Sequence, residues 1–123
     1  MKVQIDKRDR MVIITLNEPK LSSSLSPTLK SELFLVGSEG FRNIILDLTE
    51  VHYIDSSGLS ALLVGKRVCE EASGKFVLTG LNTGVQKLIK ISQLWMVLDI
   101  LPSLDEAIDF ITMQELARDL RSA

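Results

Sequence analysis

The chain has 123 residues, of which 46% are hydrophobic and 24% are charged, and its formal net charge is −2. This length and composition predict one domain over residues 1–123, with a core that needs no disulfide or metal. Acids and bases are interspersed without a basic stripe, which argues against a nucleic-acid-binding protein. The longest apolar runs are far shorter than a membrane span, and the N-terminus lacks the apolar segment of a signal peptide. We therefore expect a cytoplasmic protein without membrane insertion.

Histidine and cysteine each occur once, as His52 and Cys69. One cysteine cannot form an intrachain disulfide or a zinc cluster, and the apolar sequence around it predicts a buried, inert thiol. No Gly-x-Ser-x-Gly motif surrounds Ser56 and Ser57, so a Ser-His hydrolase is not expected. The sequence also lacks the Walker and Gly-x-Gly-x-x-Gly motifs that bind nucleotides. We therefore expect no catalytic site, no cofactor and no metal.

The chain begins with two predicted strands. Apolar and polar residues alternate over residues 3–7 and 12–16, and the short polar connection over 8–10 is typical of antiparallel neighbours. Residues 17–24 then have the composition of a loop. Ser26-Pro27 predicts the N-cap and the first residue of a helix.

Strands and helices alternate in the remainder of the chain. The expected elements are a helix that ends at Gly37 or Gly40, a buried strand over 44–48, a helix after Asp55-Ser56-Ser57-Gly58 that ends at Gly74, a strand over 76–78, a short helix through Val85, Leu88 and Ile89, and a strand over 96–100.

A last helix opens with the capping box Ser103-Leu104-Asp105-Glu106. Its predicted apolar face consists of Leu104, Ala107, Ile108, Ile111 and Leu116. A hairpin followed by alternating strands and helices predicts an α/β fold, in which a mixed, mostly parallel sheet is packed with about four helices.

Residues 43–63 carry the most informative motif: a buried strand runs into a loop, and Asp55-Ser56-Ser57-Gly58 then begins a helix. The first turn of a helix has unpaired N–H groups and a partial positive charge, so a phosphate on a serine there fits without distorting the fold. Gly58 removes a side chain where a partner's backbone or a nucleotide would approach. From the spacing alone, however, Asp55 or Ser56 as an ordinary N-cap is the more frequent explanation.

The whole chain resembles the STAS domain family, which comprises anti-sigma-factor antagonists and their relatives. The resemblance rests on Ile45-Leu46-Asp47-Leu48, on His52-Tyr53-Ile54-Asp55-Ser56-Ser57-Gly58-Leu59 and on Leu88-Ile89-Lys90-Ile91-Ser92-Gln93-Leu94-Trp95, followed by a strand and Asp105-Glu106-Ala107-Ile108. In that family the serine directly after the motif aspartate is phosphorylated by a partner that is both anti-sigma factor and serine kinase. The resemblance therefore implies that Ser56 is the acceptor, Asp55 its acidic neighbour and Ser57 a structural or secondary site.

The same resemblance implies a partner switch. The unmodified protein would bind the anti-sigma factor with serine kinase activity and free a sigma factor, as a substrate that performs no catalysis itself. The implied binding surface lies beside the loop Ser22-Ser23-Ser24 and consists of Asp55, Ser56, Ser57, Gly58, Leu59 and Ser22. A weak homodimer is left open.

One stretch departs from the family pattern. Members commonly carry Gly-x-Leu-Asp after the second strand, whereas this chain has Pro19-Lys20-Leu21-Ser22, so a serine replaces the acid. The alternative is therefore a STAS subunit or scaffold of a larger signalling or transport complex, which is not phosphorylated.

Two further positions allow more than one interpretation. Asp47 follows an apolar strand, as the acceptor of a receiver domain does, but residues 12–17 end in asparagine instead of paired acids. A structural carboxylate is therefore expected at Asp47. Trp95 and Met96 would form a partner patch if exposed, but their place between a helix and a strand is more typical of the core.

Overall fold

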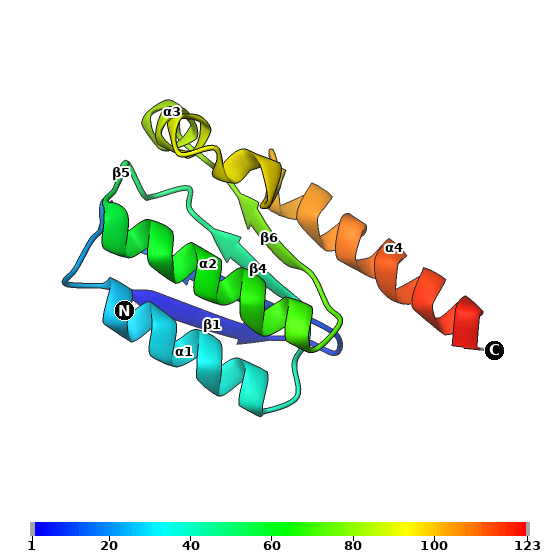
Figure 1. Ribbon diagram of the computed structural model, residues 1–123. Coiled ribbons are helices and arrows are strands. Elements are labelled where there is room, and N and C mark those ends of the chain that lie inside the picture. The colour runs from blue at the N-terminus through cyan, green and yellow to red at the C-terminus, as the bar shows by residue number, and fades with distance from the viewer. Residues whose placement is uncertain (1, 123) are drawn as a thin grey trace.

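A five-stranded mixed sheet forms the centre of the fold (Figure 1). The computed structural model describes residues 2–122; Met1 and Ala123, the ends of the predicted domain, lie outside the described residues. The strands, in their order across the sheet, are β1 (Val3–Lys7), β2 (Val12–Leu16), β4 (Ile44–Asp47), β6 (Phe76–Thr79) and β7 (Asp99–Leu101). β1 and β2 pair antiparallel, and the other neighbours pair parallel. The predicted mixed, mostly parallel sheet with an N-terminal hairpin is confirmed.

Helices cover both faces of this sheet. They are α1 (Ser26–Ser38), α2 (Ser56–Glu71), α3 (Thr83–Ile91) and α4 (Leu104–Ser122), and a short 3-10 helix, η1 (Leu94–Met96), follows α3. Figure 1 shows α1 and α2 side by side on one face, α3 near the carboxyl ends of β4 and β6, and α4 on the opposite face. Over residues 2–122 the helices agree with the predicted number.

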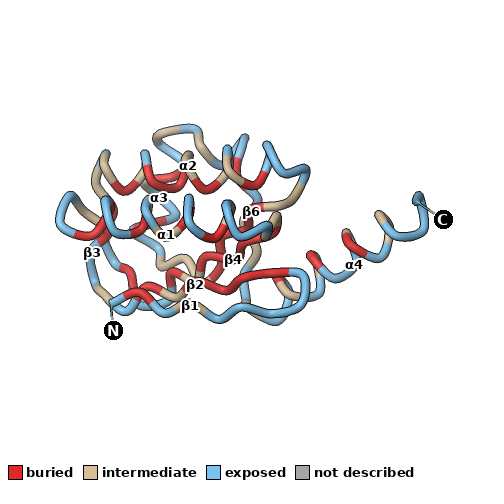
Figure 2. The backbone as a smooth tube through the Cα atoms, turned by 90° about the horizontal axis from the view of Figure 1, so that it is seen from below, coloured by how far each residue is buried: buried red, intermediate tan, exposed pale blue. Residues whose placement is uncertain are grey.

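The alternation of side chains along the strands divides the core into two layers. Ile14 and Leu46 belong to the layer under α1, α2 and α3, whereas Ile13, Ile45 and Val77 pack under α4. Successive residues of a strand point to opposite faces, so strands covered on both faces are apolar throughout. Figure 2 shows the buried segments concentrated where the helices meet the sheet.

The second half of α4 extends beyond the sheet (Figure 2). Ala107, Ile111 and Glu115, which are four residues apart, are buried, whereas Leu116 is exposed. The predicted place of Leu116 on the apolar face is therefore wrong. Each helical residue is turned by about 100° from the one before it, so Glu115 continues the inward row and Leu116 does not.

Three arginines surround the buried carboxylate of Glu115. Its oxygens lie 3.2 Å from Nε of Arg118, 3.6 Å from Nε of Arg42 and 3.8 Å from Nη1 of Arg10. Arg10 precedes β2 and Arg42 precedes β4, so both come from the amino ends of parallel strands. A buried charge is tolerated only when it is paired. The cluster therefore fixes α4 to one end of the sheet.

We expect Glu115→Ala to lower the free energy of unfolding by about 1–3 kcal/mol, because the charged hydrogen bond from Arg118, the ion pairs with Arg10 and Arg42 and the buried contacts are lost together. Urea denaturation monitored by circular dichroism measures this change. The matched control is Asp109→Ala, which removes an exposed acid from the same helix and should change stability by less than about 0.5 kcal/mol. Equal losses of unfolding free energy in the two variants would contradict the conclusion that the Glu115 cluster fixes α4 to the sheet.

The sequence does not predict β3 (Lys20–Leu21) and β5 (Tyr53–Ile54), which pair in parallel as a separate two-stranded sheet. Leu21 is the buried residue of β3, and Ile54 is the buried residue of β5. Two residues are too few to show an alternating pattern, so the prediction of a loop throughout 17–24 is wrong at this point.

Two helix ends also differ from the prediction. α1 ends at Ser38, and Gly40, at a φ of 96°, takes the left-handed conformation that follows it. α2 ends at Glu71, and there Ser73 has a left-handed φ of 61°, although Gly74 was the predicted end. An added Cβ at Gly74 would clash with the carbonyl oxygen of Arg42, so this glycine allows close packing of the two backbones.

The predicted last strand is present as β7, but it begins at Asp99 and not at residue 96, because Leu94–Met96 form η1. The predicted core positions of Trp95 and Met96 are wrong, since both of these side chains are exposed. Gln93 has a left-handed φ of 62° and turns the chain before η1. Leu98 is buried instead, with Leu94 packed against the same core.

Of two local predictions, the capping box is confirmed in part and the buried thiol in full. The N–H of Glu106 donates to Oγ of Ser103 at 3.2 Å, but among the described residues the Glu106 carboxylate accepts no hydrogen bond from the Ser103 N–H. Cys69 is buried, and this burial raises the pKa of its thiol to about 12. The thiol therefore stays protonated at neutral pH and is a poor nucleophile.

Candidate functional site

The start of α2 lies where β3, β5 and the beginning of α1 meet. Leu21 of β3 is in register with Ile54 of β5, and the carbonyl of Leu21 accepts the N–H of Asp55 at 3.2 Å. The short sheet thus ends directly at Asp55 and places the loop of Ser22-Ser23-Ser24 beside the first turn of α2. The sequence predicted this neighbourhood, although it did not predict the strands that create it.

Asp55 is the N-cap of α2, which decides between the two candidates that the spacing allowed. Its backbone is extended, and Oδ1 accepts the Ser57 hydroxyl at 2.6 Å and the Gly58 N–H at 3.0 Å. The hydrogen bond from Ser57, followed by those from the backbone N–H groups of Gly58, Ser57 and Ser23, lowers the pKa of the Asp55 carboxyl. Hydrogen bonds to a carboxylate favour its charged form, so Asp55 is ionised at neutral pH.

Ser57 faces inward and belongs to a chain of hydroxyl groups. It donates its proton to Asp55, so at the 3.1 Å contact between its Oγ and Oγ of Ser26 it is the acceptor. The single proton of the Ser26 hydroxyl is therefore shared between Ser57 and a second acceptor, the carbonyl of Ser22 at 2.8 Å. Ser26 is therefore not the predicted N-cap of α1. Leu25 occupies that position, and Ser26 joins α1 to the start of α2.

Ser56 has different surroundings. It is the first residue of α2 and is exposed, whereas Ser57 is half-buried. Among the residues that the structure describes, the Ser56 hydroxyl forms no hydrogen bond. Of the two adjacent serines, Ser56 is accordingly the one that a modifying enzyme can reach without breaking an existing contact.

Gly58 is buried and lies close to the chain's own backbone. A Cβ added there would lie 2.5 Å from the carbonyl oxygen of Leu21 and 2.6 Å from Cγ2 of Ile54. The expectation that the missing side chain leaves room for a partner or a nucleotide is therefore wrong, because β3 and β5 fill that space. That Gly58 belongs to a binding surface stays a prediction.

A groove of about 700 Å³ runs from Ser56 across to α3. Leu59, which is half-buried, lies along it, and β5 and α3 form its walls. We call it the α3 groove; it is lined among others by Tyr53, Ser56, Leu59, Lys87, Leu88 and Ile91. The sequence did not connect α3 with the motif, because no spacing rule relates residues about thirty positions apart.

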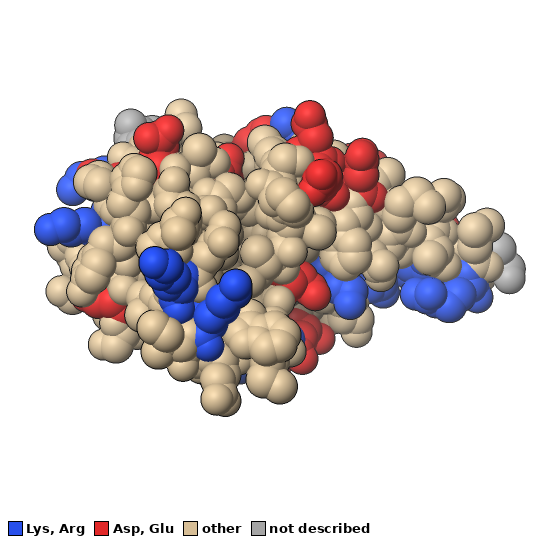
Figure 3. Space-filling model, turned by 90° about the horizontal axis from the view of Figure 1, so that it is seen from above, with Lys and Arg blue, Asp and Glu red and all other residues tan. Residues whose placement is uncertain are grey.

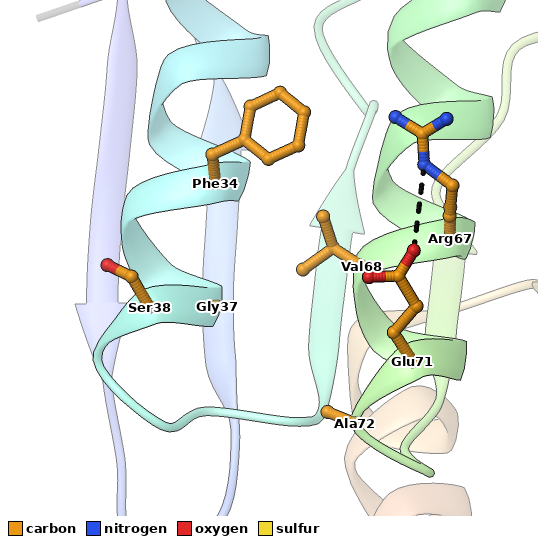
Figure 4. Close-up of a pocket in the computed structure, with 7 residues that line it drawn as sticks. All are labelled: Phe34, Gly37, Ser38, Arg67, Val68, Glu71 and Ala72. Carbon is orange, nitrogen blue, oxygen red and sulfur yellow. Dashed lines mark ion pairs between the residues drawn. The ribbon is translucent and has the colours of Figure 1, made fainter.

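A second groove, of about 510 Å³, lies between the last turns of α1 and α2 (Figure 4). Nε of Arg67 lies 4.0 Å from Oε1 of Glu71, and the ring of Phe34 stands on the α1 side. Gly37 permits the close packing of the helices, since an added Cβ would lie 2.7 Å from Cγ1 of Val68. This groove is at the end of α2 opposite to Ser56. The hydroxyl of Ser38, which also lines it, donates to the carbonyl of Leu35 at 2.7 Å and not to Glu71.

Over residues 2–122, no three His, Cys, Asp or Glu side chains lie close enough together to hold a metal ion. In the same range no helix is both long and apolar enough to span a bilayer.

The carboxylate of Asp47 accepts the N–H and the hydroxyl of Thr49, at 3.0 and 2.6 Å. This local bonding agrees with the structural role predicted for Asp47.

Comparison with known proteins identifies the family of this chain. The family model for the STAS domain matches residues 2–107, including the motif and the surrounding sheet. The chain belongs to the STAS domain family. The resemblance inferred from the sequence is thereby confirmed.

The relatives of this STAS domain include anti-sigma factor antagonists. BtrV of Bordetella bronchiseptica, named as a candidate anti-sigma factor antagonist, is 33% identical over 92 residues, which cover 75% of this chain and 78% of that protein. A candidate anti-sigma factor antagonist from Thermotoga maritima shares the fold with a TM-score of 0.84 at 22% identity, covering 89% of this chain and 94% of the other.

The anti-sigma factor antagonist SpoIIAA of Bacillus matches in two states. Its unphosphorylated form has a TM-score of 0.72 at 20% identity, and its phosphorylated form has a TM-score of 0.70 at 22% identity. Each comparison covers 89% of this chain, and 97% and 98% of the two SpoIIAA chains. The STAS fold of this chain is thus similar to both forms of that protein.

We expect Asp55→Asn to reduce stability at neutral pH and to make stability less sensitive to acid. Because the pKa of Asp55 is lowered in the folded state, its contribution is complete above the ordinary carboxyl pKa and is lost as the pH falls through the lowered value. Urea denaturation at several pH values measures this difference. Asp109→Asn is the control, and a variant of Asp55 that follows the wild-type pH profile would contradict the assignment.

Proposed function

We propose that this chain is an anti-sigma-factor antagonist whose partner binding is switched by phosphorylation of Ser56. The observation that carries the proposal is the difference between two adjacent serines. Ser57 is tied to Asp55 and Ser26, whereas the Ser56 hydroxyl is exposed at the start of α2. The order of aspartate and serine is also the one that the family resemblance implies for the phosphoacceptor.

In the proposed cycle, the unphosphorylated protein binds an anti-sigma factor with serine kinase activity, and a sigma factor is released. The kinase then transfers a phosphoryl group to Oγ of Ser56, and the modified antagonist dissociates. The chain is the substrate in this step and performs no catalysis. We place the cycle in the cytoplasm, where sigma factors act, and assign it to one STAS domain over residues 1–123.

Electrostatics supports dissociation without unfolding. A phosphate on Ser56 adds a charge of about −1.5 to −2 beside the ionised Asp55. The N–H groups and partial positive charge of the first turn of α2 offset this charge within the domain. At a partner interface the same group must lose its water, which costs several kcal/mol. The likeness of this fold to both forms of SpoIIAA is consistent with a switch that leaves the domain folded.

The second candidate function is a STAS subunit or scaffold that is not phosphorylated. It is favoured by Ser22, which stands where family members commonly carry an acid. Its hydroxyl lies 3.3 Å from that of Ser24, so the loop is held by a neutral contact. Ser22 and its neighbours then serve a constitutive interface in place of a switch.

Identification of the partner comes first. Affinity capture with the wild-type chain, followed by mass spectrometry of the captured protein and of Ser56, separates the two candidates. A captured serine kinase together with phosphate on Ser56 supports the switch. Transport subunits captured with an unmodified chain would support the scaffold.

We expect the captured kinase and ATP to label the wild type and Ser57→Ala, but not Ser56→Ala. The reason is the accessibility of the Ser56 hydroxyl and the engagement of the Ser57 hydroxyl. Phosphopeptide mapping measures the site directly. Undiminished labelling of Ser56→Ala would show that Ser56 is not the phosphoacceptor.

We expect Ser56→Asp to bind the kinase about 100-fold more weakly than the wild type, because a charge that must be desolvated costs several kcal/mol. Its melting temperature should stay within about 4 °C of the wild-type value, since the residue is exposed. Ser56→Ala is the matched control and should keep its affinity in the presence of ATP. Calorimetry of both variants decides this, and an unfolded or fully binding Ser56→Asp protein would exclude an electrostatic block.

A further inference from the structure

The end of α3 and η1 expose a group of large apolar side chains. Ile91 is 79% exposed, Trp95 is 55% exposed and Met96 is 67% exposed. Val97 follows them and is also exposed. We call these four residues the α3–η1 patch. Apolar side chains gathered on a surface in this way mark an interaction site more often than isolated ones do.

The core of the domain is complete without the four side chains of the α3–η1 patch. The inward side of α3 is occupied by Val85 and Ile89, both of which are buried. Around η1, Leu94 and Leu98 contribute to the core, and the residues between them point away from it. Because the core is already filled on this side, the patch is available for another molecule.

The charges beside the patch define the chemistry of that molecule. Lys87 and Lys90 are exposed on α3, residues 83–96 contain no acid, and the lining of the α3 groove contains one carboxylate, that of Asp55, which is engaged by Ser57 and Gly58. Within the described part of the chain neither lysine forms an ion pair, so both ammonium groups are available. Figure 3, which views the end of the molecule that carries α3, shows basic atoms standing within a largely uncharged area. A complementary surface is therefore apolar and acidic.

The shape of the site favours a protein segment over a lipid surface. The α3 groove is a hollow of about 700 Å³ that can receive protruding side chains. Peripheral membrane helices usually combine a free amphipathic face with a cluster of about 4–8 basic residues. Here α3 has nine residues, its other side is buried in the core, and it carries two lysines.

The patch is continuous with the proposed switch. Ile91 and Lys87 line the α3 groove together with Ser56, so a segment seated in the groove reaches the phosphorylation site. We propose that the α3 groove and the α3–η1 patch dock an acidic, apolar segment of the kinase partner, and that this docking needs no phosphate on Ser56. The inference rests on the proposed function, in which Ser56 controls the same complex. Trp95 is the expected anchor, since buried aromatic side chains carry much of the energy of protein interfaces.

The test uses the intact chain and the purified kinase that labels Ser56. Calorimetry compares the wild type with Ile91→Ser/Trp95→Ser, and with the charge reversal Lys87→Glu/Lys90→Glu. The matched control is Met113→Ser/Leu120→Ser, which changes two α4 residues that are 61% and 69% exposed. Thermal melts establish that all variants are folded, as expected for exposed positions.

We expect both α3 variants to bind the kinase at least about tenfold more weakly, and the control to bind within about twofold of the wild type. The loss should be the same in a Ser56→Ala background, because docking needs no phosphate on Ser56. Trp95 is the only tryptophan of the chain, so its emission should shift to shorter wavelength when the wild type binds.

The outcomes separate this inference from the proposed switch. If the α3 variants bind like the wild type while Ser56→Asp does not, the docking surface is wrong and the switch stands. If the α3 variants are weakened while Ser56→Asp binds normally, the docking surface stands and the switch is wrong. Sedimentation with vesicles of phosphatidylcholine and phosphatidylglycerol tests the lipid alternative. Vesicle binding that the Ile91/Trp95 change abolishes, with unchanged kinase affinity, would overturn the inference.

Discussion

The ionised carboxylate of Asp55 determines the arrangement of the whole site. It caps α2 through the Gly58 N–H and holds the Ser57 hydroxyl at 2.6 Å, while its own N–H is fixed by Leu21 of β3. These bonds join three segments that lie far apart in the sequence. Because the Asp55 carboxylate accepts the hydroxyl of Ser57, Ser57 faces inward. Ser56, which lies between these two residues in the sequence, is left on the surface.

This geometry gives two identical side chains different chemistry. A helix turns by about 100° per residue, so the side chains of adjacent residues point in different directions. Ser57 points to Ser26 and Asp55 and contributes to the fold, whereas Ser56 points outward and contributes a free hydroxyl. Phosphorylation of Ser57 would break the contacts that hold the site together. A phosphate on Ser56 leaves those contacts intact.

The sequence predicted the parts of the structure that follow from periodicity and from local chemistry. The hairpin, the central strands and the capping of α2 depend on alternation and on one aspartate, and each was found near its predicted place. The errors have a different physical cause. The pairing of β3 with β5 joins segments about thirty residues apart, and the inward place of Glu115 depends on arginines from two distant turns.

The region around Trp95 illustrates the same limit at the binding surface. An apolar run between a helix and a strand is typical of the core, yet Leu94 and Leu98 alone satisfy the core here. Whether the residues between them are buried depends on the left-handed turn at Gln93 and on how much space the neighbouring helices leave. Neither quantity can be read from hydrophobicity, so the exposed patch became evident only in three dimensions.

The two ends of the sheet have separate electrostatic tasks. At the amino ends of β2 and β4, the arginines around Glu115 neutralise a buried charge and fix α4. At the other end, Lys87 shares the α3 groove with Ser56 and has no partner among the described residues. In the proposed switch, a phosphate in this groove would repel an acidic partner segment and also compete with it for Lys87. Both effects weaken the same complex, so one modification suffices without any change of fold.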